Sequence, residues 1–314
     1  MRAVTFTDDG QLSVEEHSDP TPGHGEVLVR VHAAGLNGAD IHQLKGGYPA
    51  PPGSPPDIPG LELAGEVAER GPGAERFAVG DRVMSIVGGG GQAELTTVNE
   101  RVLMPVPENL SWAQAGGVPE VFTTAHDAVF TQAGLLVGER LLVHGGAGGV
   151  GTAAIGLGVA AGARVTATVR NPDLRDRVAE LGAVVIEPEG FREHGPFDVI
   201  LELIGAVNMM DNLKALETGG RITVIGMGAG ATGELNLGLL LMKRACIYGS
   251  TLRARPLEQK AATARAMERS VLPLLTAGAV EVSIAETYPL ADAASAYEHF
   301  QRGGKLGKIV ITID

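Results

Sequence analysis

A glycine-rich stretch between two apolar segments constrains this chain more than any other feature. The apolar strand 141–143 runs into the turn 144–151, and the small and apolar residues of 152–157 favour a close-packed helix. The turn fits the spacing G-x-G-x-x-G through Gly146, Gly148 and Gly151. Glycine here allows a tight turn, a close approach of the backbone to a pyrophosphate and close packing of helix on strand, while the helix N-terminus favours phosphate. The stretch therefore predicts a dinucleotide site, with a merely flexible loop as the alternative.

Length, charge and cysteine content narrow the class of protein. The 314 residues are enough for two domains with separate cores. The formal net charge of -12 argues against nucleic acid as the main partner. No apolar run is long enough to span a bilayer and no apolar signal region opens the chain, so we expect a cytoplasmic protein with no membrane partner. The single cysteine, Cys246, excludes an internal disulfide, and we expect it to be a small, buried core residue.

The first part of the chain, up to about residue 115, indicates β-structure. Apolar and polar residues alternate in four segments, which are 26–33, 61–70, 81–86 and 92–98. The four glycines of 88–91 are interpreted as a flexible connector. The Pro/Gly-rich segment 46–56 cannot be regular helix or central strand, so we expect a surface loop of the kind that often lines a site.

The second part alternates strands with helices. Ser111 is an expected helix N-cap, and apolar strands are expected at 141–143, 164–169, 184–186, 197–201, 221–225 and 245–249. This order predicts a parallel sheet covered on both faces, as in doubly wound nucleotide-binding folds. The link from 186 to 197 is too short for a full crossover helix, so we expect one reduced crossover.

The last part of the chain is expected to return to the first domain. A helix over 258–275, interrupted by Pro273, and a helix over 291–300 precede an alternating strand at 308–313. We therefore expect an α/β protein with one domain over 1–117, completed by 270–314, and a dinucleotide-binding domain over 118–269.

The end of the second nucleotide-domain strand indicates which dinucleotide binds. An acidic residue there would bind the ribose 2′-OH of NAD, but 168–171 contains none and has Arg170 instead. A guanidinium suits a 2′-phosphate better than a diol, which favours NADPH. The alternative is that Arg170 is a solvated loop charge, and Arg175 is a weaker candidate for the same role.

Several motifs together give the chain a family resemblance. They lie at 34–40, 47–49, 58–65, 118–125, the glycine turn, 250–253 and 307–310. With these motifs the chain resembles the medium-chain dehydrogenase/reductase superfamily over nearly its whole length. Within it, the chain is most similar to the zinc-independent, zeta-crystallin-like quinone oxidoreductases, nearest the subgroup of the p53-inducible quinone oxidoreductase.

The resemblance implies a fold, an assembly and a metal-free site. The fold is a GroES-like β-rich catalytic domain joined to a Rossmann domain, and relatives form a homodimer through the edge strand that corresponds to 245–249. Zinc-dependent relatives have a cysteine at the position of Asn37 and a histidine at that of Leu61. Both ligands are absent, so no metal is expected. His42 and His144 are interpreted as surface or structural residues.

The resemblance also implies which residues surround the nicotinamide and the substrate. These are Asn37, Tyr48 and Thr124, where Thr124 is preferred to Thr123 because an alanine follows it. An asparagine amide can orient the carboxamide, a ribose hydroxyl or a substrate oxygen. Tyr48 offers a phenolic O–H and a ring face for a flat quinone, although it also fits a surface aromatic in a proline-rich loop. A dedicated general acid is left open.

Cofactor contacts follow from the same resemblance. The residues expected at the phosphates lie in the glycine turn and are Gly146, Gly148, Gly149, Val150 and Gly151. Arg170 and Asn171 are expected at the adenosine ribose. Further cofactor contacts are expected at the strand ends, from Ile204, Gly226, Met227, Ser250, Thr251 and Leu252. Lys308 is the expected contact from the tail of the chain. Lys308 also fits a solvated strand residue.

Three functions remain open from the sequence. The first is NADPH-dependent reduction of a quinone or a related enone. The second is reduction of an enoyl thioester or alkenal double bond, because those reductases share the segment around Asn37 and Tyr48. The third, from another class, is an NADPH-binding protein without catalysis.

Overall fold

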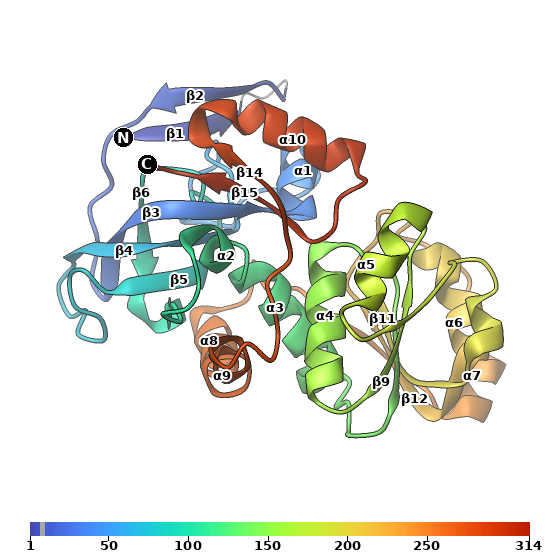
Figure 1. The fold of residues 1–314 in the computed structure, drawn as a ribbon. Helices are drawn as coiled ribbons and strands as arrows, with labels where there is room; N and C mark the ends of the chain where they lie inside the picture. The colour runs from blue at the N-terminus through green and yellow to red at the C-terminus, as the bar shows by residue number, and fades with distance from the viewer. Residues whose placement is uncertain (7–9) are drawn as a thin grey trace.

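Two sheets, placed next to each other, carry the helices and loops of this protein (Figure 1). The computed structural model describes residues 1–6 and 10–314. Among these residues, no helix is both long and apolar enough to cross a membrane.

The first sheet is mostly antiparallel and combines the start of the chain with its end. Its order is β14-β15-β3-β4-β5-β7, and β6 also pairs with β3. The strands are β3 (Glu26–Leu36), β4 (Glu62–Arg70), β5 (Arg82–Ile86), β6 (Leu95–Asn99), β7 (Met104–Pro105), β14 (Ile284–Pro289) and β15 (Lys308–Thr312). β15 runs antiparallel to β3 with Ile309 opposite Leu36, so the late strand joins this sheet as expected.

Short elements surround the first sheet, and some of them were not predicted. The hairpin of β1 (Arg2–Phe6) and β2 (Leu12–Glu16) and the helix α1 (Gly38–Leu44) are the missed elements. The helix α10 (Ala293–Arg302) packs on β14 and β15. β2 is largely exposed, so its residues lack the strong apolar alternation that sequence patterns detect.

The second sheet is parallel and has the order β10-β9-β8-β11-β12-β13. Its strands are β8 (Arg140–Val143), β9 (Arg164–Thr168), β10 (Val184–Ile186), β11 (Phe197–Glu202), β12 (Leu216–Val224) and β13 (Cys246–Gly249). The helices are α4 (Gly149–Ala160), α5 (Arg175–Ala179), α6 (Met209–Ala215) and α7 (Leu237–Lys243). This strand order is that of a Rossmann sheet. A single 3-10 turn, η4 (Phe191–His194), links β10 to β11, which confirms the reduced crossover.

Helices in the middle of the chain join the two sheets. They are α2 (Trp112–Gly116), α3 (Pro119–His126), the π-helical η2 (Asp127–Gln132), α8 (Leu257–Ser270) and α9 (Leu272–Thr276). Ser111 caps α2 as predicted, through a capping box with Gln114. One apolar cluster includes Met84 of the first sheet, Phe122 of α3, Leu141 of the second sheet and Met267 of α8. The two sheets therefore share a continuous core across this helical layer.

Two sequence expectations are wrong, and a third is confirmed. Cys246 is exposed rather than buried, because β13 is the edge of the sheet. The glycines of 88–91 form a largely buried loop rather than a flexible connector, and the N–H of Gly90 donates to the carbonyl of Ile58 (2.9 Å). The interruption of the long helix at Pro273 is confirmed, because α8 ends at Ser270 and α9 begins at Leu272 with the proline in its first turn, where a missing N–H is tolerated.

The domain division remains a proposal. We propose a first domain of 1–117 with 270–314 and a second of 118–269, and the pairing of β15 with β3 supports this assignment. The boundary at 269/270 falls in the last turn of α8.

Candidate active site

The glycine turn between β8 and α4 forms a close-packed cradle. Gly145 has a φ of +69°, a left-handed conformation that favours glycine. A Cβ on Gly151 would lie 2.4 Å from the carbonyl oxygen of Gly145, and a Cβ on Gly146 would lie 2.8 Å from Ala167 Cβ. Gly148 is the N-cap of α4 and has no side chain to occupy the N–H groups of the first turn. The cradle therefore fits the pyrophosphate of a dinucleotide.

The predicted cofactor residues gather at one edge of the parallel sheet. Apart from Lys308, which begins β15 of the first sheet, each follows the carboxyl end of a strand, where open α/β sheets bind ligands. The turn with Gly149 and Val150 follows β8, Arg170 and Asn171 follow β9, Ile204 follows β11, Gly226 and Met227 follow β12, and Ser250, Thr251 and Leu252 follow β13.

The tail of the chain meets the glycine turn directly. The N–H of Gly307 donates to the carbonyl of Ala147 (2.9 Å), and Gly307 also forms an isolated parallel bridge with Gly148. The Lys308 side chain passes so close to Gly149 that a Cβ there would lie 2.8 Å from its Cδ. The same Cβ would lie 2.9 Å from Val121 Cγ1, so glycine at 149 leaves room for both side chains at the start of α4.

Lys308 ends in a buried polar cluster with two residues of the first sheet region. Its Nζ donates to Asn37 Oδ1 (2.7 Å) and to Glu62 Oε1 (2.5 Å), and both charged side chains are almost fully buried. Asn37 Nδ2 donates in turn to Glu62 Oε1 (2.8 Å). Both ends of the Asn37 amide are therefore bonded within the protein, while its carbonyl oxygen keeps one acceptor position. Glu62 is a residue that the sequence analysis missed.

Two further carboxyl groups lie close to this cluster. Asp40 is completely buried and accepts hydrogen bonds from the N–H groups of Asn37 (2.8 Å) and Gly60 (3.1 Å). Glu120 is the second residue of α3, its N–H donates to Glu62 Oε2 (2.8 Å), and its own Oε2 is buried without a partner. Burial raises the pKa of Asp40 to about 7, and burial followed by the charge of Glu62 raises that of Glu120 to about 8.

Arg253 fixes the loop that carries Tyr48. This buried guanidinium donates to the carbonyls of Gly88 (2.8 Å) and Tyr48 (2.8 Å) and to Gln43 Oε1 (2.5 Å). Its Cζ also lies 5.1 Å from the centre of the Tyr48 ring. Tyr48 is only partly buried, and burial, followed by the charge of Glu120, raises its pKa. No role was predicted for Arg253, although the motif 250–253 contains it.

The two neighbouring threonines of α3 are both buried. Thr124, the predicted site residue, is 6% exposed. Thr123 is 2% exposed, and its hydroxyl has no hydrogen-bond partner. Ser250 is engaged elsewhere, since its hydroxyl donates to Asp127 Oδ2 (2.6 Å), which also receives Arg255 Nη2 (2.7 Å).

The two arginines after β9 differ in their availability. Arg175 pairs with Glu187 (2.7 Å) and donates to the carbonyl of Val169 (3.2 Å). Arg170 is exposed, and over 1–6 and 10–314 no carboxylate forms an ion pair with it. Asn171 accepts from the N–H of Asp173 (3.0 Å) and caps a 3-10 turn. Arg170 is therefore the side chain free to meet an added phosphate.

The histidines have structural or surface positions. His144 is buried, with its ring bonded to Thr168 Oγ1 (3.2 Å) and Asn212 Oδ1 (2.8 Å), and burial lowers its pKa. His42 is exposed. Leu61 is buried and offers no ligand atom. Within the described part of the chain, no three His, Cys, Asp or Glu side chains are grouped to hold a metal ion.

Comparison with known proteins assigns this arrangement to a family. Residues 23–108 match the alcohol dehydrogenase GroES-like domain, and residues 149–269 match the zinc-binding dehydrogenase family. The quinone oxidoreductase of Mus musculus is 31% identical over 333 residues, covering 100% of this chain and 98% of that protein. The chain belongs to the medium-chain dehydrogenase/reductase superfamily. It is an oxidoreductase similar to the quinone oxidoreductases, with the expected GroES-like and Rossmann folds.

Two other similar proteins bear on the choice of acceptor and on the choice of cofactor. A mycocerosic acid synthase-like polyketide synthase of Mycobacterium tuberculosis is 31% identical over 303 residues, which is 93% of this chain but 14% of that protein. A mycobacterial protein solved in complex with NADPH is 26% identical and superimposes with a TM-score of 0.87 over 99% of each chain.

Glu120→Gln is expected to make stability less dependent on pH. Because the pKa of Glu120 is about 8 in the folded protein, the folded state keeps a proton that the unfolded chain releases from about pH 4.5 upward. The contribution of Glu120 to the free energy of unfolding of the wild type therefore falls as pH rises through this window. Thermal unfolding midpoints at pH 5 and pH 8 will lie closer together in the variant than in the wild type.

The exposed Glu108→Gln is the matched control and should keep the wild-type difference between the two midpoints. A Glu120→Gln protein with that same difference would contradict the raised pKa. The pKa of the buried Asp40 is also raised, so this residue should still lower the free energy of unfolding between pH 5 and pH 8 in both variants.

Proposed function

We propose that this oxidoreductase transfers hydride from NADPH to a quinone at the junction of its two domains. The observation that carries the proposal is the meeting of the glycine cradle with Lys308, Asn37 and Glu62 at the carboxyl edge of the parallel sheet. The similarity to quinone oxidoreductases over the full chain supports the choice of acceptor.

The residues present can hold the proposed cofactor. The N–H groups at the start of α4 would bind the pyrophosphate, and the exposed guanidinium of Arg170 would bind the 2′-phosphate. Ile204, Gly226 and Met227 would lie along the riboses, and Ser250, Thr251 and Leu252 near the carboxamide. When bound, NADPH supplies the hydride.

The chain's own residues would then stabilise the charge that develops on the acceptor. The Tyr48 hydroxyl and the buried Thr124 hydroxyl are the donors that we assign to the acceptor oxygen. Lys308 holds Asn37 in place through Oδ1, and Arg253 holds the backbone of Tyr48. We propose a zinc-independent reaction, because Leu61 carries no ligand atom where zinc-dependent relatives have a histidine.

A second candidate is reduction of an enoyl thioester or alkenal double bond. The similarity to a segment of a polyketide synthase favours this reading. A non-catalytic NADPH-binding protein is the remaining alternative, and it would share the glycine cradle without turnover.

We also propose a cytoplasmic homodimer joined through β13. This strand is the edge of the parallel sheet, and an exposed edge invites pairing with a second chain. The neighbouring helix α7 exposes Leu237, Leu241 and Met242 by 68%, 76% and 70%. An apolar surface next to an open strand edge is suited to burial against the same surface of a second copy.

Steady-state oxidation of NADPH tests the reaction. The purified protein is expected to turn over 9,10-phenanthrenequinone or 1,4-benzoquinone with a higher kcat/KM than crotonyl-CoA. A clear preference for the thioester would replace the quinone assignment with the second candidate. Turnover of neither acceptor class would support the non-catalytic alternative.

Arg170→Ala is expected to weaken NADPH binding far more than NADH binding. Losing a charge-assisted hydrogen bond costs about 1.5–3 kcal/mol, which corresponds to about a tenfold or greater rise in the Kd for NADPH. Fluorescence titration of both cofactors checks this, with the exposed Arg177→Ala as control. If Arg170→Ala weakened the binding of NADPH and NADH equally, Arg170 would not be a ligand of the 2′-phosphate.

Leu241→Asp is expected to convert the dimer to a monomer in light scattering coupled to size exclusion. The new charge would have to be buried without a partner in the proposed interface. Val79→Asp places the same charge at a 63% exposed site in the first domain and should leave the mass unchanged. A wild-type protein of monomeric mass would rule out the homodimer.

A further inference from the structure

One carboxyl group beside the buried cluster has no part in the proposed hydride transfer. Glu120 is the second residue of α3, and its N–H donates to Glu62 Oε2 (2.8 Å). Its own Oε2 is buried and, among the described residues, has no hydrogen-bond partner, although the residue as a whole is partly exposed. A buried polar atom without a partner costs free energy, so its position indicates a ligand, a bound water or a role in catalysis.

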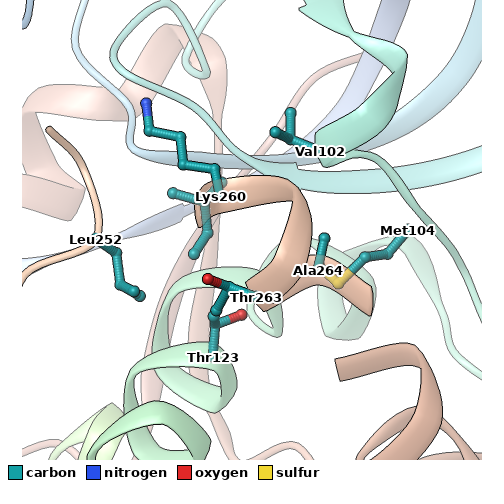
Figure 2. A pocket seen from close by; sticks show the side chains of 8 residues that line it. Val102, Met104, Thr123, Leu252, Lys260, Thr263 and Ala264 are labelled. Carbon is teal, nitrogen blue, oxygen red and sulfur yellow. The ribbon is translucent and has the colours of Figure 1, made fainter. Parts of the chain in front are cut away.

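A second polar atom of α3 is unpaired, and its surroundings explain it. Thr123 Oγ1 is buried without a hydrogen-bond partner in the described part of the chain, and Thr123 lines a cavity of about 20 Å³ between α3 and α8 (Figure 2). This volume has room for about one water molecule, which would bond to the Thr123 hydroxyl. Glu120 does not line that cavity, so the same water does not account for its unpaired Oε2.

Glu120 lies close to both hydroxyl groups that are assigned to the acceptor oxygen. It precedes Thr124 by four residues in α3, so the two side chains are neighbours on one face of the helix. Its charge also acts on Tyr48, because burial and then the charge of Glu120 raise the pKa of that phenol. A molecule bonded to Tyr48 and Thr124 would therefore lie next to the Glu120 carboxyl group.

The surroundings of Glu120 keep its carboxyl group protonated at neutral pH. Burial, followed by the charge of Glu62, raises its pKa to about 8. The other charged groups that act on it are Lys308 of β15, Asp40 of α1 and Arg253, which follows β13. Lys308 and Arg253 favour the carboxylate, so they would stabilise the charge left on Glu120 after it releases its proton. An acid with a pKa near the working pH is suited to donate a proton in catalysis.

The proposed reaction needs one proton for each hydride. Transfer of the hydride breaks the C4–H bond of the nicotinamide, which is oxidised, and reduces the quinone to a hydroquinone anion. One O–H bond must then form on the anionic oxygen. The hydroxyls of Tyr48 and Thr124 can hydrogen-bond to this oxygen, but the pKa of Tyr48 is raised above its ordinary value and a threonine hydroxyl does not titrate near pH 7.

We infer that Glu120 is the proton donor of the proposed reaction. Its O–H bond breaks as the O–H bond of the hydroquinone forms, and the resulting carboxylate takes a proton from solvent before the next turnover. The inference rests on the proposed quinone reduction, and it separates two roles in the site. Tyr48 and Thr124 hold the acceptor oxygen, whereas Glu120 supplies the proton.

The proton on Glu120 is measured without cofactor or turnover. Infrared difference spectra of the full-length protein, titrated from pH 6 to pH 9, should show the carbonyl band of a protonated carboxyl group that disappears at about pH 8. This band should be missing in Glu120→Gln and retained in the exposed control Glu108→Gln. Asp40, with a pKa of about 7, should give a band that is lost at lower pH in all three proteins. A band at about pH 8 that persists in Glu120→Gln would overturn the inference, because another group would then hold the proton.

Steady-state kinetics test whether this proton is used. At pH 7, Glu120→Gln is expected to lower kcat/KM for 1,4-benzoquinone about 100-fold or more, and Glu120→Asp, which keeps a carboxylic acid, should restore part of it. In the wild type, kcat/KM should fall as pH rises through about 8, because the free enzyme loses the proton of its acid. Glu120→Gln should show no such fall, and its Kd for NADPH should equal that of the wild type.

Thr123→Val, which removes the other unpaired polar atom of α3, is the matched kinetic control and should keep the fall in kcat/KM at about pH 8. If quinones are reduced and Glu120→Gln keeps either the wild-type kcat/KM or this fall, Glu120 is not the donor and quinone reduction stands. If the wild type reduces no quinone, the proposed function fails and the inference fails with it.

Discussion

The buried ion pair between Lys308 and Glu62 holds the candidate site together. Lys308 comes from the last strand of the first sheet, Glu62 begins β4, and Asn37 lies between them in the hydrogen-bond network. Breaking a buried pair by removing one partner costs about 3–5 kcal/mol, since the other charge is left without compensation. Removing either partner would also disturb neighbouring segments, because Gly307 bonds the glycine turn and Glu62 accepts the first N–H of α3.

The carboxyl groups in and around this ion pair outnumber the cations, and two of the carboxyl groups have raised pKa values. Asp40, Glu62 and Glu120 are three carboxyl groups, and Lys308 and Arg253 are the cations whose fields reach them. With pKa values of about 7 and about 8, Asp40 and Glu120 keep protons that ordinary carboxyl groups would release. These protons remove the repulsion between neighbouring carboxylates, so the cluster can remain buried beside the proposed hydride-transfer site.

The sequence predicted what depends on local backbone geometry. The glycine turn, the strand ends and the cap at Ser111 each follow from requirements within a few residues, and the parallel sheet follows from their order. Contacts between distant segments were not predictable in this way. Arg253 meets Gly88, Tyr48 and Gln43 only after folding, and the exposure of Cys246 depends on β13 being the outermost strand. The long tail strand was expected, but its direct bond to the glycine turn was not.

Lys308 follows its partner Glu62 by 246 residues, and this separation sets an order of events during synthesis. Residues 1–6, 10–117 and the Rossmann strands leave the ribosome first, so Glu62 and Asp40 are present well before their ammonium partner. Until β15 inserts beside β3, Glu62 lacks the ammonium group with which it pairs, and the first sheet lacks the strand opposite Gly35 and Leu36. Assembly of the site thus waits for the synthesis of β15, and a chain interrupted before β15 would expose the unfinished sheet edge to cellular quality control.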